Sequence, residues 1–191
     1  MNKVTVLVQG YARVNDDGSW QASSTCTLIE SNNLKIIIDP GSDRKALIQA
    51  FKKHNLSFKD INWVFITHRH LDHSSLIGIF PNAKIIDEES FQYGSHGAMH
   101  KNLIPDTDVK ILQTPGHSPR HGSLLVKTKK GNIAIAGDVF YWKQGEKQTI
   151  DINQPDDFAD GNFNDLKKSR QLLLSKADFI IPGHGKMFLV E

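Results

Sequence analysis

The chain has 191 residues, of which 39% are hydrophobic and 23% charged, values that are ordinary for a globular protein with a sizeable core. Its formal net charge of +2 is too small to imply a polyanionic partner, and its one cysteine, Cys26, excludes an intrachain disulfide and fits a reducing compartment. Residues Met1–Gly10 lack a signal-peptide pattern, and no stretch approaches the roughly 18 apolar residues of a membrane span. We therefore expect a cytoplasmic protein without a membrane partner, built as a single domain over residues 1–191.

Strand signals dominate the first 39 residues. Apolar and β-branched runs predict strands at Val4–Val8, Ser24–Glu30 and Leu34–Ile38. A turn signal that begins at Asp39 ends the last of these strands, and apolar residues at helical spacing then run from Ala46 to Phe51. Trp63–Ile66 has the composition of a buried strand.

The second half mixes short strands with one clear helix. Strands are predicted at Lys84–Ile86, Val109–Leu112, Ser123–Thr128, Asn132–Ala136 and Ala177–Ile181. Phe91–Pro105 has no clear periodicity and is predicted to be a loop, whereas Phe163–Leu174 has the best helical pattern. This order of elements indicates an α+β fold in which two sheets pack together with helices outside.

A histidine-rich segment directly follows the predicted strand Trp63–Ile66. Its ligand-type residues are His68, His70, Asp72 and His73. Side chains two residues apart on an extended chain point to the same side, so His68 and His70 share a face, and the other two can reach the same volume as the chain turns. Neutral imidazole and carboxylate groups suit zinc, iron or manganese.

Three more ligand-type residues stand at the ends of other predicted strands. His117 follows Val109–Leu112, Asp138 follows the run that ends at Ala136, and His184 follows the strand that ends at Ile181. Each lies beside a glycine, which permits a close approach of the backbone. Four strand ends that carry seven such residues predict a metal site.

These residues, in this order, resemble the signature of the metallo-β-lactamase superfamily, and Asp39 before Pro40 and Gly41 matches its first motif. The resemblance covers nearly the whole chain. It is closest to the small subgroup of animal metallo-β-lactamase domain-containing proteins, on the segments Gln9–Ala12, Gly137–Phe140 and Pro182–Gly185.

The resemblance implies a four-layer αβ/βα sandwich, in which two mixed sheets are flanked by helices, and a site that holds two metal ions. It assigns the first ion to His68, His70 and His117, and the second to Asp72, His73 and His184. Asp138 would bridge both ions, and Asp39 would orient a ligand through a hydrogen bond unless it is merely a turn residue. Two Zn²⁺ ions are expected because His70 replaces the Glu of flavodiiron members, with Fe or Mn as alternatives.

The implied activity is hydrolysis by a metal-bridging hydroxide, and three functions are compatible with it or with the ligand set. The first is hydrolysis of a small ester, lactone or thioester, because we expect neither the extra C-terminal domain of glyoxalase II nor the inserted cap of RNA-processing members. The second is a phosphodiesterase or nuclease acting on RNA or DNA, because the subgroup includes members proposed to act on RNA. The third is an iron persulfide dioxygenase with one metal ion.

Two residues carry predicted catalytic roles besides metal binding. Asp72 could orient the nucleophile or pass a proton to the leaving group. Tyr141 stands three residues after Asp138, an offset that resembles the tyrosine of quorum-quenching lactonases, and it would donate to the substrate carbonyl unless it is a packing residue. The expected partner is a small-molecule substrate, with a nucleic acid as the alternative. A homodimer is compatible with the resemblance, because family members often dimerise, but the sequence identifies no interface.

Overall fold

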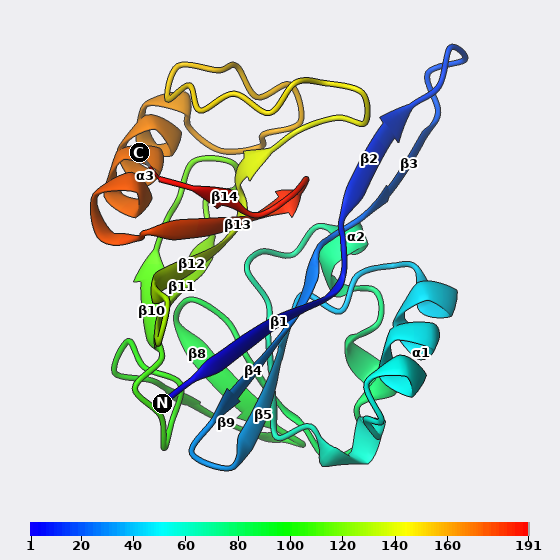
Figure 1. The fold of residues 1–191 in the computed structure, drawn as a ribbon, viewed down its shortest axis with the longest axis vertical. Coiled ribbons are helices and arrows are strands. Elements are labelled where there is room, and N and C mark those ends of the chain that lie inside the picture. The colour runs from blue at the N-terminus through cyan, green and yellow to red at the C-terminus, as the bar shows by residue number, and fades with distance from the viewer. Residues whose placement is uncertain (191) are drawn as a thin grey trace.

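A computed structural model describes residues 1–190, which form two β-sheets with helices on their outer faces (Figure 1). The first sheet has seven strands in the order β1-β4-β5-β6-β7-β8-β9. Its strands are Lys3–Val8 (β1), Cys26–Ser31 (β4), Leu34–Ile38 (β5), Trp63–Phe65 (β6), Lys84–Ile86 (β7), Ser90–Tyr93 (β8) and His96–Met99 (β9). β5, β6 and β7 run parallel, and the other pairs are antiparallel, so the sheet is mixed.

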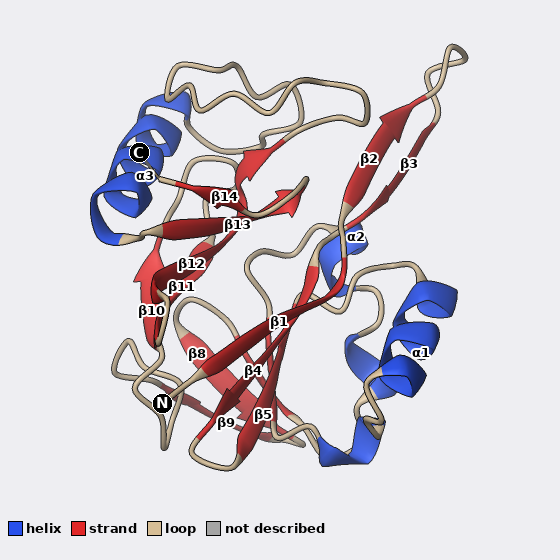
Figure 2. Cartoon of the chain, in the orientation of Figure 1, coloured by secondary structure: helices blue, strands red, loops and turns tan. Residues whose placement is uncertain are grey.

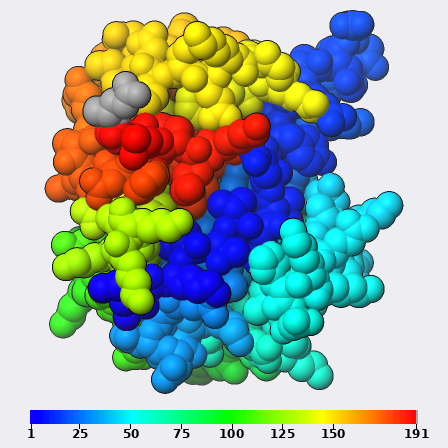
Figure 3. All heavy atoms as spheres, in the orientation of Figure 1, coloured from blue at the N-terminus to red at the C-terminus, as the bar shows by residue number. Residues whose placement is uncertain are grey.

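The second sheet has five strands in the order β10-β11-β12-β13-β14, with only β12 and β13 parallel. Its strands are Lys110–Gln113 (β10), Gly122–Thr128 (β11), Gly131–Tyr141 (β12), Phe179–His184 (β13) and Phe188–Leu189 (β14). A separate hairpin is formed by Tyr11–Val14 (β2) and Trp20–Ser23 (β3). Its tip projects from the body of the protein (Figure 3).

Helices cover the outer face of each sheet (Figure 2). The α-helices are Arg44–Lys53 (α1), Leu71–Ser74 (α2) and Phe163–Lys176 (α3), and single 3₁₀ turns occur at Phe58–Asp60 (η1) and Ile77–Ile79 (η2). The Asp43 side chain caps α1 by accepting from the Ala46 amide, and the Asn162 side chain caps α3 in the same way. No helix among residues 1–190 is both long and apolar enough to cross a bilayer.

Alternation along the strands divides the core into three apolar layers. Ile36 and Ile38 of β5 face the second sheet and pack in one cluster with Leu124 and Ile135. Ile37, between them in sequence, faces the opposite way and packs with residues of α1. The outer face of the second sheet packs in the same manner against Leu166 and Leu173 of α3. This is the four-layer αβ/βα sandwich with two mixed sheets that the sequence predicts.

Two local predictions were wrong. Phe91–Pro105 is not simply a loop, because it contains most of β8 and all of β9. β9 is the edge strand of the sheet, and all of its residues are exposed. An edge hairpin of this kind buries too little to produce an apolar period in the sequence. The strand predicted to end at Ala136 continues to Tyr141, so Asp138 lies inside β12, where the pairing with β13 is irregular around Gly137.

Candidate metal centre

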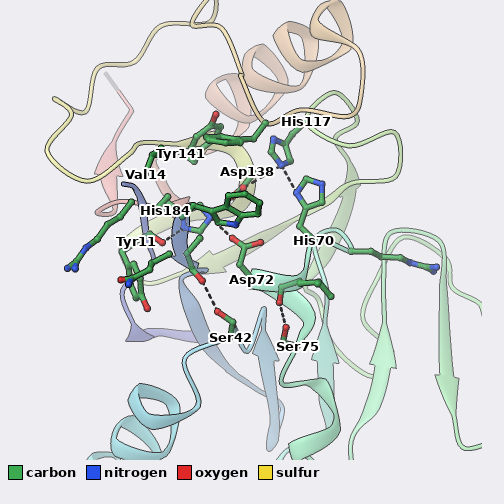
Figure 4. A pocket seen from close by; sticks show the side chains of 18 residues that line it. Tyr11, Val14, Ser42, His70, Asp72, Ser75, His117, Asp138, Tyr141 and His184 are labelled. Carbon is green, nitrogen blue, oxygen red and sulfur yellow. Dashed lines mark hydrogen bonds and ion pairs between the residues drawn. The ribbon is translucent and has the colours of Figure 1, made fainter. Parts of the chain in front are cut away.

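The candidate ligands gather where the parallel strands of both sheets end (Figure 4). In the first sheet, His68 follows β6 and His70 immediately precedes the short helix α2, which carries Asp72 and His73. In the second sheet, Asp138 lies in β12 beside β13, and His184 is the last residue of β13. The seven ligand-type residues predicted from the sequence thus come from both sheets to one place. The seventh, His117, lies between β10 and β11.

Three histidines form the first group of potential ligands. One nitrogen from each of His68, His70 and His117 can be chosen so that all lie within 4.8 Å of one another. His117 Nε2 and His70 Nδ1 are 3.1 Å apart. His68 and His117 are buried, whereas His70 is half-buried and reaches the cavity above the site.

Asp72, His73 and His184 form the second group under the same 4.8 Å limit. Asp72 Oδ2 lies 3.1 Å from His184 Nε2 and 3.8 Å from His73 Nε2. Burial opposes ionisation of Asp72, but a hydrogen bond from His184 and the charge on His73 hold its pKa below the usual value. A carboxylate at this point is suited to binding a cation.

Asp138 lies between the two groups. Its Oδ2 is 3.5 Å from His117 Nε2 of the first group and 3.5 Å from His184 Nε2 of the second. Its Oδ1 is 3.3 Å from His73 Nε2. This is the position that a bridging carboxylate would occupy.

Protons on histidine and a bound divalent ion are two ways to balance the charge of the buried Asp138 carboxylate. Burial alone would raise the pKa of Asp138, yet the charges on His73 and His184 hold it well below its usual value. Burial likewise lowers the pKa of His184, but the Asp138 carboxylate and its hydrogen bond raise it to about 9. Protons on histidine therefore balance the buried carboxylate in the protein alone. A divalent ion would balance the same charge while displacing these protons.

Unpartnered atoms give an independent test of whether the residues fit a metal. His68 Nε2 is buried and has no hydrogen-bond partner among the described residues. His73 Nε2 and Asp138 Oδ1 are also buried and form no hydrogen bond, although they lie 3.3 Å apart as an ion pair. Leaving such atoms unpartnered costs about 1–3 kcal/mol each, so native proteins rarely do so without a reason. His68, His73 and Asp138 also form a third possible ligand group, which takes one histidine from each of the two groups above and the carboxylate between them. The donor set of imidazole and carboxylate fits zinc, and it also accommodates iron or manganese.

Asp39 contacts a candidate ligand rather than only forming a turn. Its Oδ2 accepts a hydrogen bond from His73 Nδ1 at 2.7 Å, which leaves His73 Nε2 directed at the site. Thr67 holds the carboxylate in place by donating its amide to Oδ1 at 2.8 Å and its hydroxyl to Oδ2 at 2.7 Å. Asp39 is thus placed to orient His73 as a metal ligand.

Tyr141 lies beside the site, but its hydroxyl has a partner. The hydroxyl donates to Asp156 Oδ1 at 2.9 Å, and the ring lies edge-on to those of His117 and His184. Burial and the Asp156 charge raise the pKa of Tyr141, so it remains a donor. The predicted donation to a substrate carbonyl stays a prediction, and it requires the hydroxyl to leave Asp156.

His121 is close to the ligands but is engaged on both ring nitrogens. The Asp138 amide donates to its Nε2 at 3.3 Å, and its Nδ1 donates to the Thr114 hydroxyl at 2.9 Å. Burial lowers its pKa to about 3, which keeps the ring neutral. His121 therefore supports the backbone of Asp138.

Asp156 and Thr67 are the contacting residues that sequence reasoning missed. Thr67 precedes the histidine-rich segment, so its place next to the ligands offered a signal. Asp156 lies in a segment without periodicity, between Lys143 and Asn162, that contains several other aspartates. No local pattern separates it from them.

A cavity of about 730 Å³ opens above the ligands. His70, Asp72 and Asp138 lie at its base, and the β2–β3 hairpin forms one wall with Val14 and Trp20. Figure 4 shows Val14 and Tyr11 on the same side of the cavity as His184. A substrate bound there would meet both the ligand groups and apolar side chains.

Comparisons with known proteins agree with this fold. A family profile described as the metallo-beta-lactamase superfamily matches residues 20–92 and 100–184. Metallo-beta-lactamase domain-containing protein 1 of Mus musculus is 31% identical over 198 residues, which cover 97% of this chain and 74% of the mouse protein. The N-acyl homoserine lactonase of Bacillus cereus is 23% identical, over 78% of this chain and 65% of the lactonase.

A solved structure from Thermotoga maritima, assigned to the metallo-beta-lactamases, superposes with a TM-score of 0.70 at 21% identity. The superposition covers 98% of this chain and 99% of that protein.

Proposed function

The chain belongs to the metallo-beta-lactamase superfamily, and we propose that it is a metal-dependent hydrolase of small ester, lactone or thioester substrates. Two zinc ions are the proposed cofactors, one held by His68, His70 and His117 and the other by Asp72, His73 and His184. One observation carries the proposal: two ligand groups that contact a single buried carboxylate, Asp138, at the base of an open cavity.

Bound metal ions would supply Lewis acidity and a water whose pKa falls from 15.7 towards about 7. The protein contributes the geometry around them. Asp39 fixes His73, and the carbonyl of Tyr11 accepts from His184 Nδ1 at 3.0 Å, so both rings present Nε2 to the site. The Asp72 side chain is 25% exposed, which leaves its carboxylate accessible to a substrate and able to take up or pass on a proton.

The cavity wall supports a carbonyl substrate with an apolar part. Trp20, Val14, Leu71 and Phe158 line the cavity and are 72%, 51%, 76% and 46% exposed, so apolar surface remains free for a ligand. Burying it would contribute about 25 cal/mol per Å². The similarity to an N-acyl homoserine lactonase, whose substrate name combines an acyl chain with a lactone, points the same way.

A phosphodiester is the second candidate substrate, because Arg13 and Arg69 also line the cavity. Arginine is well suited to phosphate. However, Arg69 pairs with Asp87 at 3.0 Å and Arg13 donates to Gln144, so both side chains already have partners. This makes the carbonyl substrate the better choice.

The two candidates are tested by kcat/KM for a lactone with an acyl chain and for a phosphodiester, measured in one buffer on zinc-loaded and manganese-loaded protein. We expect the lactone to be preferred by about a hundredfold or more, a ratio that differential binding in the cavity can supply. Preference for the phosphodiester would instead make RNA the next substrate to try.

We also expect Trp20→Ala to lower kcat/KM for a lactone with a long acyl chain more than for a lactone with a short one.

A further inference from the structure

We propose that Asp156 is a positioning residue that fixes His117 for metal binding, and that Tyr141 acts on the site through Asp156. Asp156 Oδ2 accepts a hydrogen bond from His117 Nδ1 at 2.7 Å, while its Oδ1 accepts from the Tyr141 hydroxyl at 2.9 Å. The inference rests on the metal site of the proposed function but not on its substrate.

The Asp156 carboxylate is built into the protein rather than placed at its surface. Its side chain is only 1% exposed, and its Oδ1 accepts a further hydrogen bond from the Phe158 amide at 3.1 Å. Three donors therefore satisfy both oxygens. A carboxylate that is held in this way can fix the plane of a neighbouring imidazole and its tautomer.

The tautomer has a direct consequence for metal binding. Because the carboxylate is an acceptor, His117 Nδ1 must carry the proton, which leaves the Nε2 lone pair free. His117 Nε2 lies 3.1 Å from His70 Nδ1 and 3.5 Å from Asp138 Oδ2, among the other candidate ligands. Asp156 therefore orients His117 in the first group in the same way that Asp39 orients His73 in the second, by accepting a hydrogen bond from Nδ1.

The segment that carries Asp156, residues 143–162, is hydrogen-bonded to both the side chain and the backbone of His117. Besides the side-chain contact, the amides of Asp160 and Gly161 donate to the carbonyl of His117 at 3.0 and 3.2 Å. The ring and the backbone of one ligand are thus both held by this segment, which forms no regular secondary structure.

Arg170 of α3 anchors the same segment. The Arg170 residue is 3% exposed, and its Nη1 donates to the carbonyls of Ile152 at 3.1 Å and Gln154 at 2.6 Å, just before Asp156 in the chain. Its Nε donates to the carbonyl of Val139 in β12, the strand that carries Asp138 and Tyr141. The position of Asp156 is therefore fixed relative to the ligand strand.

The experiment measures zinc affinity by competition with a chelator for wild-type protein, Asp156→Ala, Asp156→Asn and Asp157→Asn. Loss of an outer partner of a ligating histidine typically weakens binding ten- to hundredfold, and we expect this for Asp156→Ala. Asp156→Asn preserves an oxygen acceptor for His117 and should lose less, about tenfold. The matched control, Asp157→Asn, changes a neighbouring side chain that is 68% exposed and pairs with Lys143, and should keep wild-type affinity.

Two further readouts separate positioning from a purely structural role. The absorption spectrum of the Co²⁺-loaded protein reports ligand geometry, and it should change in Asp156→Asn but not in Asp157→Asn. Tyr141→Phe leaves Asp156 with two of its donors, so its zinc affinity should fall by less than that of Asp156→Ala while its Co²⁺ spectrum shifts. A lowered Tm of the metal-free Asp156 variants with unchanged affinity and spectrum would overturn the inference.

The outcomes for this inference and for the proposed function differ. A wild-type chain that binds two ions, with Asp156 variants that bind them equally well, would overturn only the role of Asp156. A wild-type chain that binds no metal would overturn both.

Discussion

Replacement of Asp138 by alanine should remove metal binding and hydrolysis together. Among the candidate ligands, Asp138 has oxygens 3.3–3.5 Å from His73, His117 and His184, so its loss affects both groups. Metal ions stabilise transition-state charge by several kcal/mol, and about 4 kcal/mol corresponds to roughly a thousandfold in kcat/KM. Metal content by elemental analysis and kcat/KM on the preferred substrate measure the two effects.

Asp138→Asn is the companion variant, because it preserves the size of the side chain but removes the charge that holds the histidines. It should retain the fold and lose most of the affinity for the ions. An Asp138→Ala protein that keeps two ions and full activity would rule out the assignment of this residue as a ligand.

Gly183→Ala should impair metal binding and hydrolysis almost as severely as Asp138→Ala, although it replaces none of the candidate ligands. A Cβ atom at Gly183 would lie 1.8 Å from Asp138 Oδ1, far below any tolerated contact. The backbone there cannot move easily, because the Gly183 carbonyl accepts from the Thr25 amide at 2.7 Å and from the Thr25 hydroxyl at 2.9 Å. Asp138 must therefore turn away, and a misplacement of about 1 Å can cost about a hundredfold in rate.

The matched control is Gly78→Ala, since a Cβ at Gly78 meets nothing within 4 Å. Both variants should be compared with wild type for zinc affinity, kcat/KM and the Tm of the metal-free protein. Gly183→Ala with wild-type zinc affinity would contradict the packing of β13 against Asp138.

The candidate ligands could be found in the sequence because each stands close to a strand end, and strand ends are visible as breaks in apolar runs. The runs that end near Phe65 and Ile181 are buried and nearly continuous, so His68 and His184 stand out directly after them. The family resemblance then supplied their grouping, which the sequence order alone does not contain. The roles that it assigns as metal ligands remain predictions, although the structure brings all seven residues together.

What the sequence did not reveal depends on contacts between distant segments. Asp156 and His117 are 39 positions apart and meet because the segment between β12 and α3 folds back onto the site, where Arg170 is one of the residues that hold it. The continuation of β12 past Asp138 depends equally on its partner β13, because parallel pairing is not visible in the residues of one strand. Such features follow from tertiary structure rather than from local patterning.

The central claim is a site for two metal ions that is required for hydrolysis, and a titration of metal-free protein with Zn²⁺ tests it most directly. Bound metal per chain and lactone hydrolysis should be followed together. We predict saturation at two ions per chain, with full activity only as the second is bound. Parallel titrations with Fe²⁺ and Mn²⁺ would identify the preferred metal. Saturation at one ion per chain, or activity that is unaffected by complete removal of metal, would contradict the claim, and a single bound iron would favour the persulfide dioxygenase alternative.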